Sequence, residues 1–209
     1  MSVKLIKPII WILLITSCYT SVITNSWHSE NNTQKVYKKI LVVALVNSKS
    51  YLLLTENMEN HLAADLNEKG ITSISSFKVY GPKAFNGLTE NEVLNKIEKK
   101  DIDAVLTIVL LDKEKEKYYV PGRVYYTPYN IYHRRFWGYY STMYERIYEP
   151  GYYEVNTNYF WESNFYDMTN KELIYSVQTK SFNPENVESL AHEYGKIILN
   201  DLYKTGVLK

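Results

Sequence analysis

The side chains best suited to catalysis are few in this chain, and they do not form a familiar pattern. One cysteine, Cys18, and four histidines, His28, His61, His133 and His192, occur in 209 residues. His61 and Asp65 are spaced to meet on one face of a helix, but an exposed surface pair explains that spacing equally well. His192-Glu193 lacks the second histidine of a zinc protease, because Lys196 stands in its place. No Gly-x-Ser-x-Gly motif occurs, so we predict no catalytic residue, no metal and no cofactor.

Four carboxylates near a group of aromatic residues leave one enzymatic alternative open. Glycoside hydrolases use two carboxyl groups on either side of the scissile bond. Glu145, Glu149, Glu154 and Glu162 lie close in sequence to tyrosine, phenylalanine and tryptophan. Acidic residues spread along strands and turns usually face solvent, so we keep hydrolysis of an envelope glycan as the alternative to a non-catalytic role.

Cys18 ends a short apolar segment at the start of the chain. Lys4 and Lys7 precede the aliphatic run from Ile9 to Ile15, which is interrupted by Trp11 alone. This run is much shorter than the roughly 20 residues that cross a bilayer as a helix. The sequence Ile15-Thr16-Ser17-Cys18 resembles the lipobox of bacterial lipoproteins, and residues 1–17 then form the signal peptide.

The lipobox resemblance implies an anchor and a location. Cys18 would carry a diacylglycerol and, after cleavage, an acylated amino terminus, and two or three acyl chains such as palmitate hold a protein stably at a membrane. Tyr19 stands where an aspartate would retain an enteric lipoprotein in the inner membrane, which favours the outer membrane. We therefore expect a lipid-anchored protein of the outer membrane whose body faces the periplasm.

Residues 18–36 are rich in serine, threonine and asparagine and show no apolar periodicity. We predict a flexible tether there, with an average reach of about 20–25 Å. A single folded domain is predicted for residues 37–209, a size that buries a substantial core. The formal net charge of +1 argues against a nucleic-acid partner.

A tyrosine-rich segment at 118–153 holds 12 of the 21 tyrosines, together with four arginines. Aromatic and cationic side chains together bind sugars, protein partners or membrane interfaces. Tyrosine is also a good structural filler, so a loop or hairpin laid over a sheet explains the composition as well. The binding residues we predict are Tyr125, Tyr126, Arg134, Arg135, Phe136, Trp137, Tyr139 and Tyr140.

The first half of the domain reads as alternating strands and helices. Residues 39–46 and 103–111 are continuous apolar runs typical of buried strands. The helices expected between them carry Leu54, Met58, Leu62 and Leu66 at spacing four, and the Thr89–Glu92 capping box. This order predicts parallel pairing. Asn47 to Ser50 could bind an anion at the carboxyl end of the first strand, although a capped turn explains them better.

The second half reads as a hairpin followed by a helix. The alternating charges of 112–117 indicate a solvated edge or turn. Apolar and polar residues alternate from Tyr152 to Phe165 and again from Leu173 to Val177, with a turn at 167–170 between them. Asn183-Pro184 then predicts the start of a helix whose apolar stripe extends to Leu202.

This hairpin resembles one that recurs in several envelope families. Residues 165–176 read Phe-Tyr-Asp-Met-Thr-Asn-Lys-Glu-Leu-Ile-Tyr-Ser, and Asp101-Ile102-Asp103-Ala104 precedes a buried strand. Both are similar to segments of the curli-secretion lipoproteins, the lipoprotein activators of penicillin-binding proteins, and the amino-terminal domain of the Tol-system propeller protein. The tyrosine-rich insert departs from that pattern, so the partners of those families are not carried over.

These observations predict an α/β domain with a mixed sheet, parallel in its first half and antiparallel afterwards, covered by about three helices. We expect a non-catalytic envelope accessory or assembly factor. It would be held to the membrane through Cys18 and would bind a protein or glycan partner.

Overall fold

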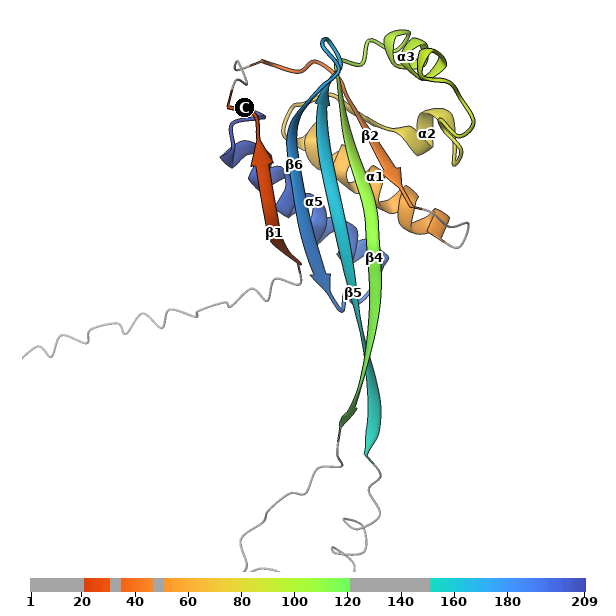
Figure 1. Ribbon diagram of the computed structural model, residues 1–209, viewed down its shortest axis with the longest axis vertical. Helices are drawn as coiled ribbons and strands as arrows, with labels where there is room; N and C mark the ends of the chain where they lie inside the picture. Colours follow the sequence, from red (N-terminus) through yellow and green to blue (C-terminus); the bar gives the residue numbers. More distant parts are fainter. Residues whose placement is uncertain (1–20, 31–34, 47–50, 121–150) are drawn as a thin grey trace, which may run out of the picture.

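The computed structural model describes residues 21–30, 35–46, 51–120 and 151–209. These residues form one six-stranded mixed sheet in the order β1-β6-β5-β4-β2-β3, with four helices among them (Figure 1). The strands are β1 (Ser21–His28), β2 (Ile40–Leu45), β3 (Ser73–Ser75), β4 (Ala104–Val120), β5 (Tyr152–Asp167) and β6 (Glu172–Phe182). The helices are α1 (Leu52–Glu68), α2 (Ser76–Tyr80), α3 (Glu90–Glu98) and α5 (Val187–Lys204).

The predicted fold class is confirmed. Strand β2 pairs in parallel with β3 and β4, whereas β4, β5, β6 and β1 pair antiparallel. The sheet changes from parallel to antiparallel pairing because helices connect the parallel strands, whereas a tight turn connects β5 to β6.

The main core lies between one face of the sheet and helices α1 and α5, which lie behind the sheet in Figure 1. The stripe predicted for α1 is buried there, and Trp161, Phe165 and Tyr175 of the sheet are fully covered. A smaller core on the opposite face joins Leu41 and Val105 of the sheet to Ile97 of α3. The rest of that second face, over β5, β6 and β1, carries no helix among the described residues.

The capping box predicted for α3 is confirmed, whereas α1 begins after Tyr51 without a side-chain cap and α5 begins later than predicted. Glu92 accepts hydrogen bonds from the Thr89 backbone N–H and hydroxyl, as the capping box predicts. Helix α5 begins at Val187 with Asn186 as its cap, and the start predicted at Asn183-Pro184 is wrong. Asn183 has a φ of 38° and its side chain accepts the Thr157 backbone N–H, so it closes the β6–α5 connection instead.

The prediction of a flexible tether over 18–36 is wrong for Ser21–His28. These residues form β1, an edge strand that pairs antiparallel with β6 from Ser21↔Ser181 to His28↔Tyr175. The absence of apolar periodicity has a physical cause, since an edge strand with one open face needs few buried side chains, and Ser21 is the buried residue of β1. Ladder hydrogen bonds and side-chain bonds, rather than apolar burial, hold this segment.

The interpretation of residues 112–117 as a solvated edge or turn is confirmed for the edge, because β4 pairs there with β5 alone, and is wrong for the turn. Strand β4 continues through them to Val120 and stays paired with β5 throughout. One irregularity interrupts the pairing between Leu110 and Asp112. From Glu114 to Tyr119 every residue of β4 is exposed, which explains why the apolar pattern gives way to alternating charge.

In the part of the chain that the structure describes, we find no helix of sufficient length and hydrophobicity to cross a membrane.

Candidate binding surface

The residues that the sequence suggested for lipidation and partner binding lie outside the described part of the chain. These are Cys18 and the eight aromatic and arginine residues Tyr125, Tyr126, Arg134, Arg135, Phe136, Trp137, Tyr139 and Tyr140. The structure does describe both ends of the tyrosine-rich segment, at the ends of β4 and β5. The candidate surface is therefore built from these two strands.

Strands β4 and β5 extend past the body of the domain as a two-stranded arm, which we define as residues 113–120 and 152–159 (Figure 1). At the root of the arm Tyr159 pairs with Lys113 on one side and Ser181 on the other. Outward from Asn158, toward Tyr152, the arm strands pair only with each other among the described residues. The seven residues that follow Lys113, up to Val120, give the arm a length of about 24 Å from its root.

One face of the arm carries only positive charge. Opposite residues of an antiparallel pair share a face, so Lys113, Lys115 and Lys117 lie with Tyr159, Thr157 and Val155. The Lys113 ammonium lies 4.8 Å from the ring centre of Tyr159 and 5.1 Å from that of Tyr51, which precedes α1. Lys117 lies 5.0 Å from the ring centre of Tyr153. We call this the lysine face, and it continues the side of the sheet that α1 and α5 cover.

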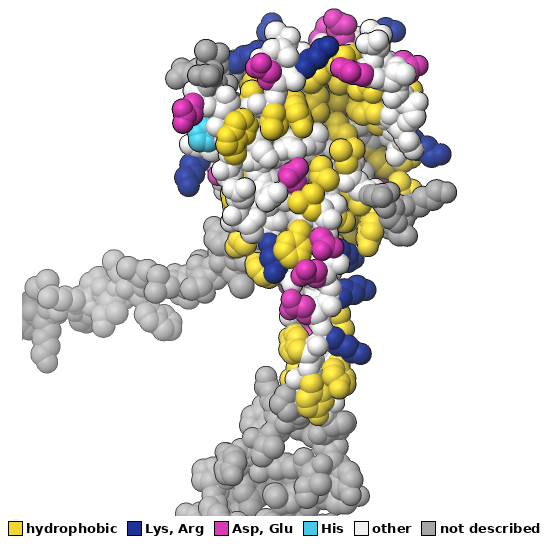
Figure 2. All heavy atoms as spheres, in the orientation of Figure 1, with side chains coloured by type: hydrophobic (Ala, Val, Ile, Leu, Met, Phe, Trp, Pro, Cys, Tyr) yellow, Lys and Arg dark blue, Asp and Glu magenta, His cyan; other side chains and the backbone are white. Residues whose placement is uncertain are grey.

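The opposite face of the arm carries only negative charge. Glu114, Glu116 and Glu154 lie there, with Asn156 and Asn158 between them. The Tyr118 hydroxyl donates to the Glu154 carboxylate at 2.6 Å, and this bond raises the pKa of Tyr118. In Figure 2 acidic side chains lie along the arm toward the viewer and basic ones project at its edge. We call the face with Glu114, Glu116 and Glu154 the glutamate face.

The end of the arm is aromatic. Tyr118, Tyr119, Tyr152 and Tyr153 are 43–64% exposed, which is high for rings of this size. The Tyr119 and Tyr153 rings pack across the two strands with their centres 5.3 Å apart. Gly151 lies so close to Tyr119 that a Cβ at this position would sit 2.1 Å from the Tyr119 hydroxyl. The arm thus presents tyrosine to solvent at the point where the undescribed segment begins.

The carboxylates proposed for catalysis are not brought together where the structure describes them. Glu154 and Glu162 are eight residues apart on one strand, which places them about 27 Å apart, against the roughly 5–10 Å that glycosidases use. Glu154 is exposed on the arm, and Glu162 accepts amide bonds from Asn164 and Gln178 on the open face of the sheet. Glu145 and Glu149 lie outside the described residues.

The histidines give no metal site in the described part of the chain. His28, His61 and His192 belong to no cluster of three or more metal-binding side chains there. His133 and the anion-site candidates Asn47 to Ser50 fall outside the described residues.

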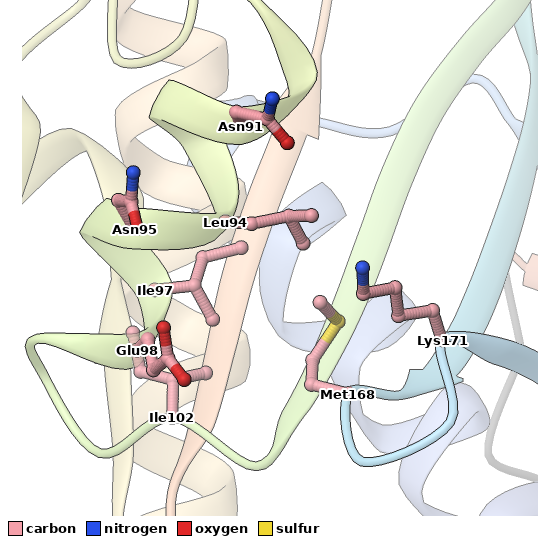
Figure 3. Close-up of a pocket in the computed structure, with 8 residues that line it drawn as sticks. All are labelled: Asn91, Leu94, Asn95, Ile97, Glu98, Ile102, Met168 and Lys171. Carbon is pink, nitrogen blue, oxygen red and sulfur yellow. The ribbon is translucent and has the colours of Figure 1, made fainter.

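A shallow groove of about 480 Å³ lies between α3 and the β5–β6 turn (Figure 3). Leu94, Ile97 and Met168 point toward one another across it, and the Lys171 ammonium approaches from the turn. The lining is half apolar and half polar, and its polar residues are Asn91, Asn95, Glu98 and Lys171.

Two buried carboxylates were not anticipated from the sequence. Glu59 is 2% exposed, and it accepts hydrogen bonds from the Ala44 backbone N–H, the Ser75 hydroxyl and the Phe77 backbone N–H at 2.5–2.8 Å. Burial raises the pKa of its carboxyl, although these bonds work in the opposite direction. Glu59 therefore joins the ends of β2 and β3 to α2. A glutamate on the apolar side of the predicted α1 helix was the one available signal.

The second carboxylate, Asp201 of α5, fastens β1 to the domain. Its Oδ2 accepts from the Ser26 hydroxyl at 2.7 Å and from the Tyr175 hydroxyl at 2.8 Å. Tyr175 is fully buried, so burial and then the neighbouring Asp201 raise the pKa of its phenol. We call Ser26, Tyr175 and Asp201 the β1 clasp.

No protein-family model matches this chain, and no curated protein matches it by sequence. By structure it is similar to a PelC dodecamer variant from Paraburkholderia phytofirmans, with 11% identity, coverage of 86% of this chain and 94% of that chain, and a TM-score of 0.44. It is also similar to lipoprotein GNA1162 from Neisseria meningitidis, with 16% identity, 79% and 98% coverage, and a TM-score of 0.43. At these values the similarities say nothing of what this chain binds or does.

Proposed function

We propose that this chain is a lipid-anchored accessory or assembly factor of the bacterial cell envelope, which binds a protein or glycan partner through the arm and the tyrosine-rich segment. The observation that carries this proposal is the arm itself. It projects about 20 Å beyond the last pair with β6, between Asn158 and Phe182, and exposes four tyrosines at its end. A folded domain gains little stability from exposed aromatic rings, whereas binding surfaces are enriched in tyrosine.

The non-catalytic role is favoured by how the acidic groups lie. The arm is two strands thick and open to water on both faces, so it provides no pocket that could bury a substrate or shift a carboxyl pKa. The two carboxylates of the hydrolase alternative that the structure describes are far apart and separately hydrogen-bonded or exposed. Hydrolysis of a glycan remains the alternative for a pair of carboxylates that includes Glu145 or Glu149, which lie outside the described residues.

The anchoring half of the proposal rests on the sequence Ile15-Thr16-Ser17-Cys18. Metabolic labelling with palmitate should mark the wild-type chain and leave Cys18→Ala unlabelled. An unlabelled wild-type chain would remove the anchor from the proposal. Membrane fractionation of the labelled chain then decides between the outer and the inner membrane.

The binding half is tested by a deletion that the register makes possible. Val120 pairs with Tyr152, so replacing residues 121–151 by Asn-Gly closes the arm with a two-residue hairpin turn. Partners are captured from cross-linked envelopes with the wild type, this deletion, and a variant with Tyr118, Tyr119, Tyr152 and Tyr153 changed to Ser. Loss of partners with an unchanged thermal unfolding midpoint supports the proposal, and an unaltered set of partners refutes it. Turnover of envelope glycan that a single Glu→Gln change abolishes would favour the hydrolase.

A further inference from the structure

The arm separates its charges completely between its two faces. Its charged residues are three lysines on one face and three glutamates on the other, so the arm as a whole is neutral. In the described ranges the ion pair found is Lys35–Asp167, and the arm's charges have no ion-pair partner there. The three lysines repeat every second residue along β4, about 6.8 Å apart, as do Glu114 and Glu116, whereas Glu154 continues the acidic row from β5, opposite Tyr118. Such a row repels itself and attracts a row of opposite sign.

We propose that the lysine face of this arm stacks on the glutamate face of the arm of a second copy of this chain. Lys115 and Lys117 alternate with Glu114 and Glu116 on one strand, so the two rows have the same repeat. When two arms lie face to face and run in the same direction, a lysine of one meets a glutamate of the other at every second residue. The tyrosines near the end of the arm flank this contact on both faces.

This contact joins two different surfaces, and so one pair of copies does not satisfy it. The first copy keeps a free glutamate face and the second a free lysine face, so further copies add in the same way. The inference rests on the proposed function only in treating the arm as the binding element. It names a second copy as one of the partners of that element.

Exposed ion pairs are individually weak and are screened by salt. We therefore expect the self-association to fall several-fold as sodium chloride rises from about 50 mM to about 500 mM. An association held mainly by apolar contacts would not weaken in this way.

Charge exchange tests the contact directly with full-length chains that carry two different affinity tags and are co-expressed and captured in detergent. One variant has Lys115→Glu and Lys117→Glu, which makes both faces acidic. The other has Glu114→Lys and Glu116→Lys, which makes both faces basic. All four side chains are exposed, and the contacts that the substitutions remove are the hydrogen bond from Asn158 to Glu116 and the contact of Lys117 with the Tyr153 ring. Lys69→Glu with Lys99→Glu, on the body, is the control for the change in net charge.

We expect each exchanged variant to lose most co-capture with itself, and the two together to recover it. A chain with all four substitutions should also recover self-capture, since its faces are again opposite, and the body control should behave as the wild type. Undiminished self-capture of either exchanged variant refutes the proposal, as does failure of the mixture to recover. Binding of the wild type to phosphatidylglycerol vesicles without co-capture would assign the lysine face to anionic lipid instead. If the envelope partners survive in a variant that no longer self-associates, the proposed function stands and this inference alone fails.

Discussion

Burial of the β1 clasp determines how much stability the domain should lose when Asp201 is replaced. In Asp201→Ala the Tyr175 hydroxyl loses its acceptor in a fully buried position, at a cost of about 1–3 kcal/mol. The exposed Ser26 hydroxyl exchanges its bond for water and costs about 0.5–1.5 kcal/mol. We therefore expect Asp201→Ala to lower the free energy of unfolding by about 2–4 kcal/mol.

A double-mutant cycle isolates the buried part of this cost. In a Tyr175→Phe background no hydroxyl remains to be orphaned, so Asp201→Ala should cost only the Ser26 bond, about 1 kcal/mol. The coupling between the two positions should then be about 1–3 kcal/mol in urea unfolding. Additive costs would refute the reasoning, because they would mean that Tyr175 finds another partner.

The clasp also predicts a local effect on the edge strand. Ser26→Ala removes one bond between β1 and the body, so it should speed amide hydrogen exchange in β1 by roughly 2–10-fold. Exchange in β5, at the centre of the sheet, provides the internal control. Equal acceleration in both strands would mean that β1 opens only when the whole domain unfolds.

Three further predictions concern buried or half-buried acids. Glu59→Gln should lower the free energy of unfolding by about 1–3 kcal/mol, because an amide cannot accept hydrogen bonds at both of its side-chain ends. Since the pKa of Glu59 is raised in the folded state, the stability that Glu59 contributes falls as pH rises above about 4.5. In urea unfolding the difference between wild type and variant should therefore become smaller from pH 4 to pH 7, and a larger difference would contradict this account. Lys35→Met should lower the free energy of unfolding by about 1 kcal/mol at pH 7. Burial alone would raise the pKa of Asp167, but the hydrogen bonds from Lys35 and Thr169 outweigh it and lower that pKa. The loss of stability should therefore disappear as pH falls below 3.8, and a loss that persisted at pH 2.5 would refute this account. Gly195→Ala should destabilise the α1–α5 contact by about 1–2 kcal/mol, because the new Cβ would lie 2.5 Å from an Asp65 carboxylate oxygen. In an Asp65→Ala background this clash is absent, so calorimetry should show that Gly195→Ala stabilises the domain by up to about 1 kcal/mol through helix propensity.

Apolar periodicity predicted the parts of the fold that packing determines. The stripe Leu54, Met58, Leu62 and Leu66 is buried as expected, and so are Trp161 and Phe165. These residues lie on elements with one covered face, where the period of the apolar residues directly reports the conformation.

Strand pairing determines the parts of the fold that could not be predicted from the sequence. Strand β1 has one buried residue, and the end of β4 has charged residues on both faces, so neither shows an apolar pattern. Both are strands because a long partner strand offers them hydrogen bonds, and that information lies elsewhere in the chain. The two-faced arm follows from the register of β4 on β5, which sequence alone does not fix.

The correction at β1 changes what an anchor at Cys18 would do. Two residues, Tyr19 and Thr20, separate Cys18 from Ser21, so the span is at most about 10 Å, compared with the 20–25 Å expected for a flexible tether. Ser21 lies in register with Ser181 and Tyr159, so the anchored end of the sheet is the end from which the arm projects (Figure 1). If Cys18 is lipidated, a chain held so closely would not turn over freely, and neighbouring copies in one membrane would share an orientation. Their arms would then run in the same direction at a raised local concentration, which is the geometry that brings the lysine and glutamate rows into register.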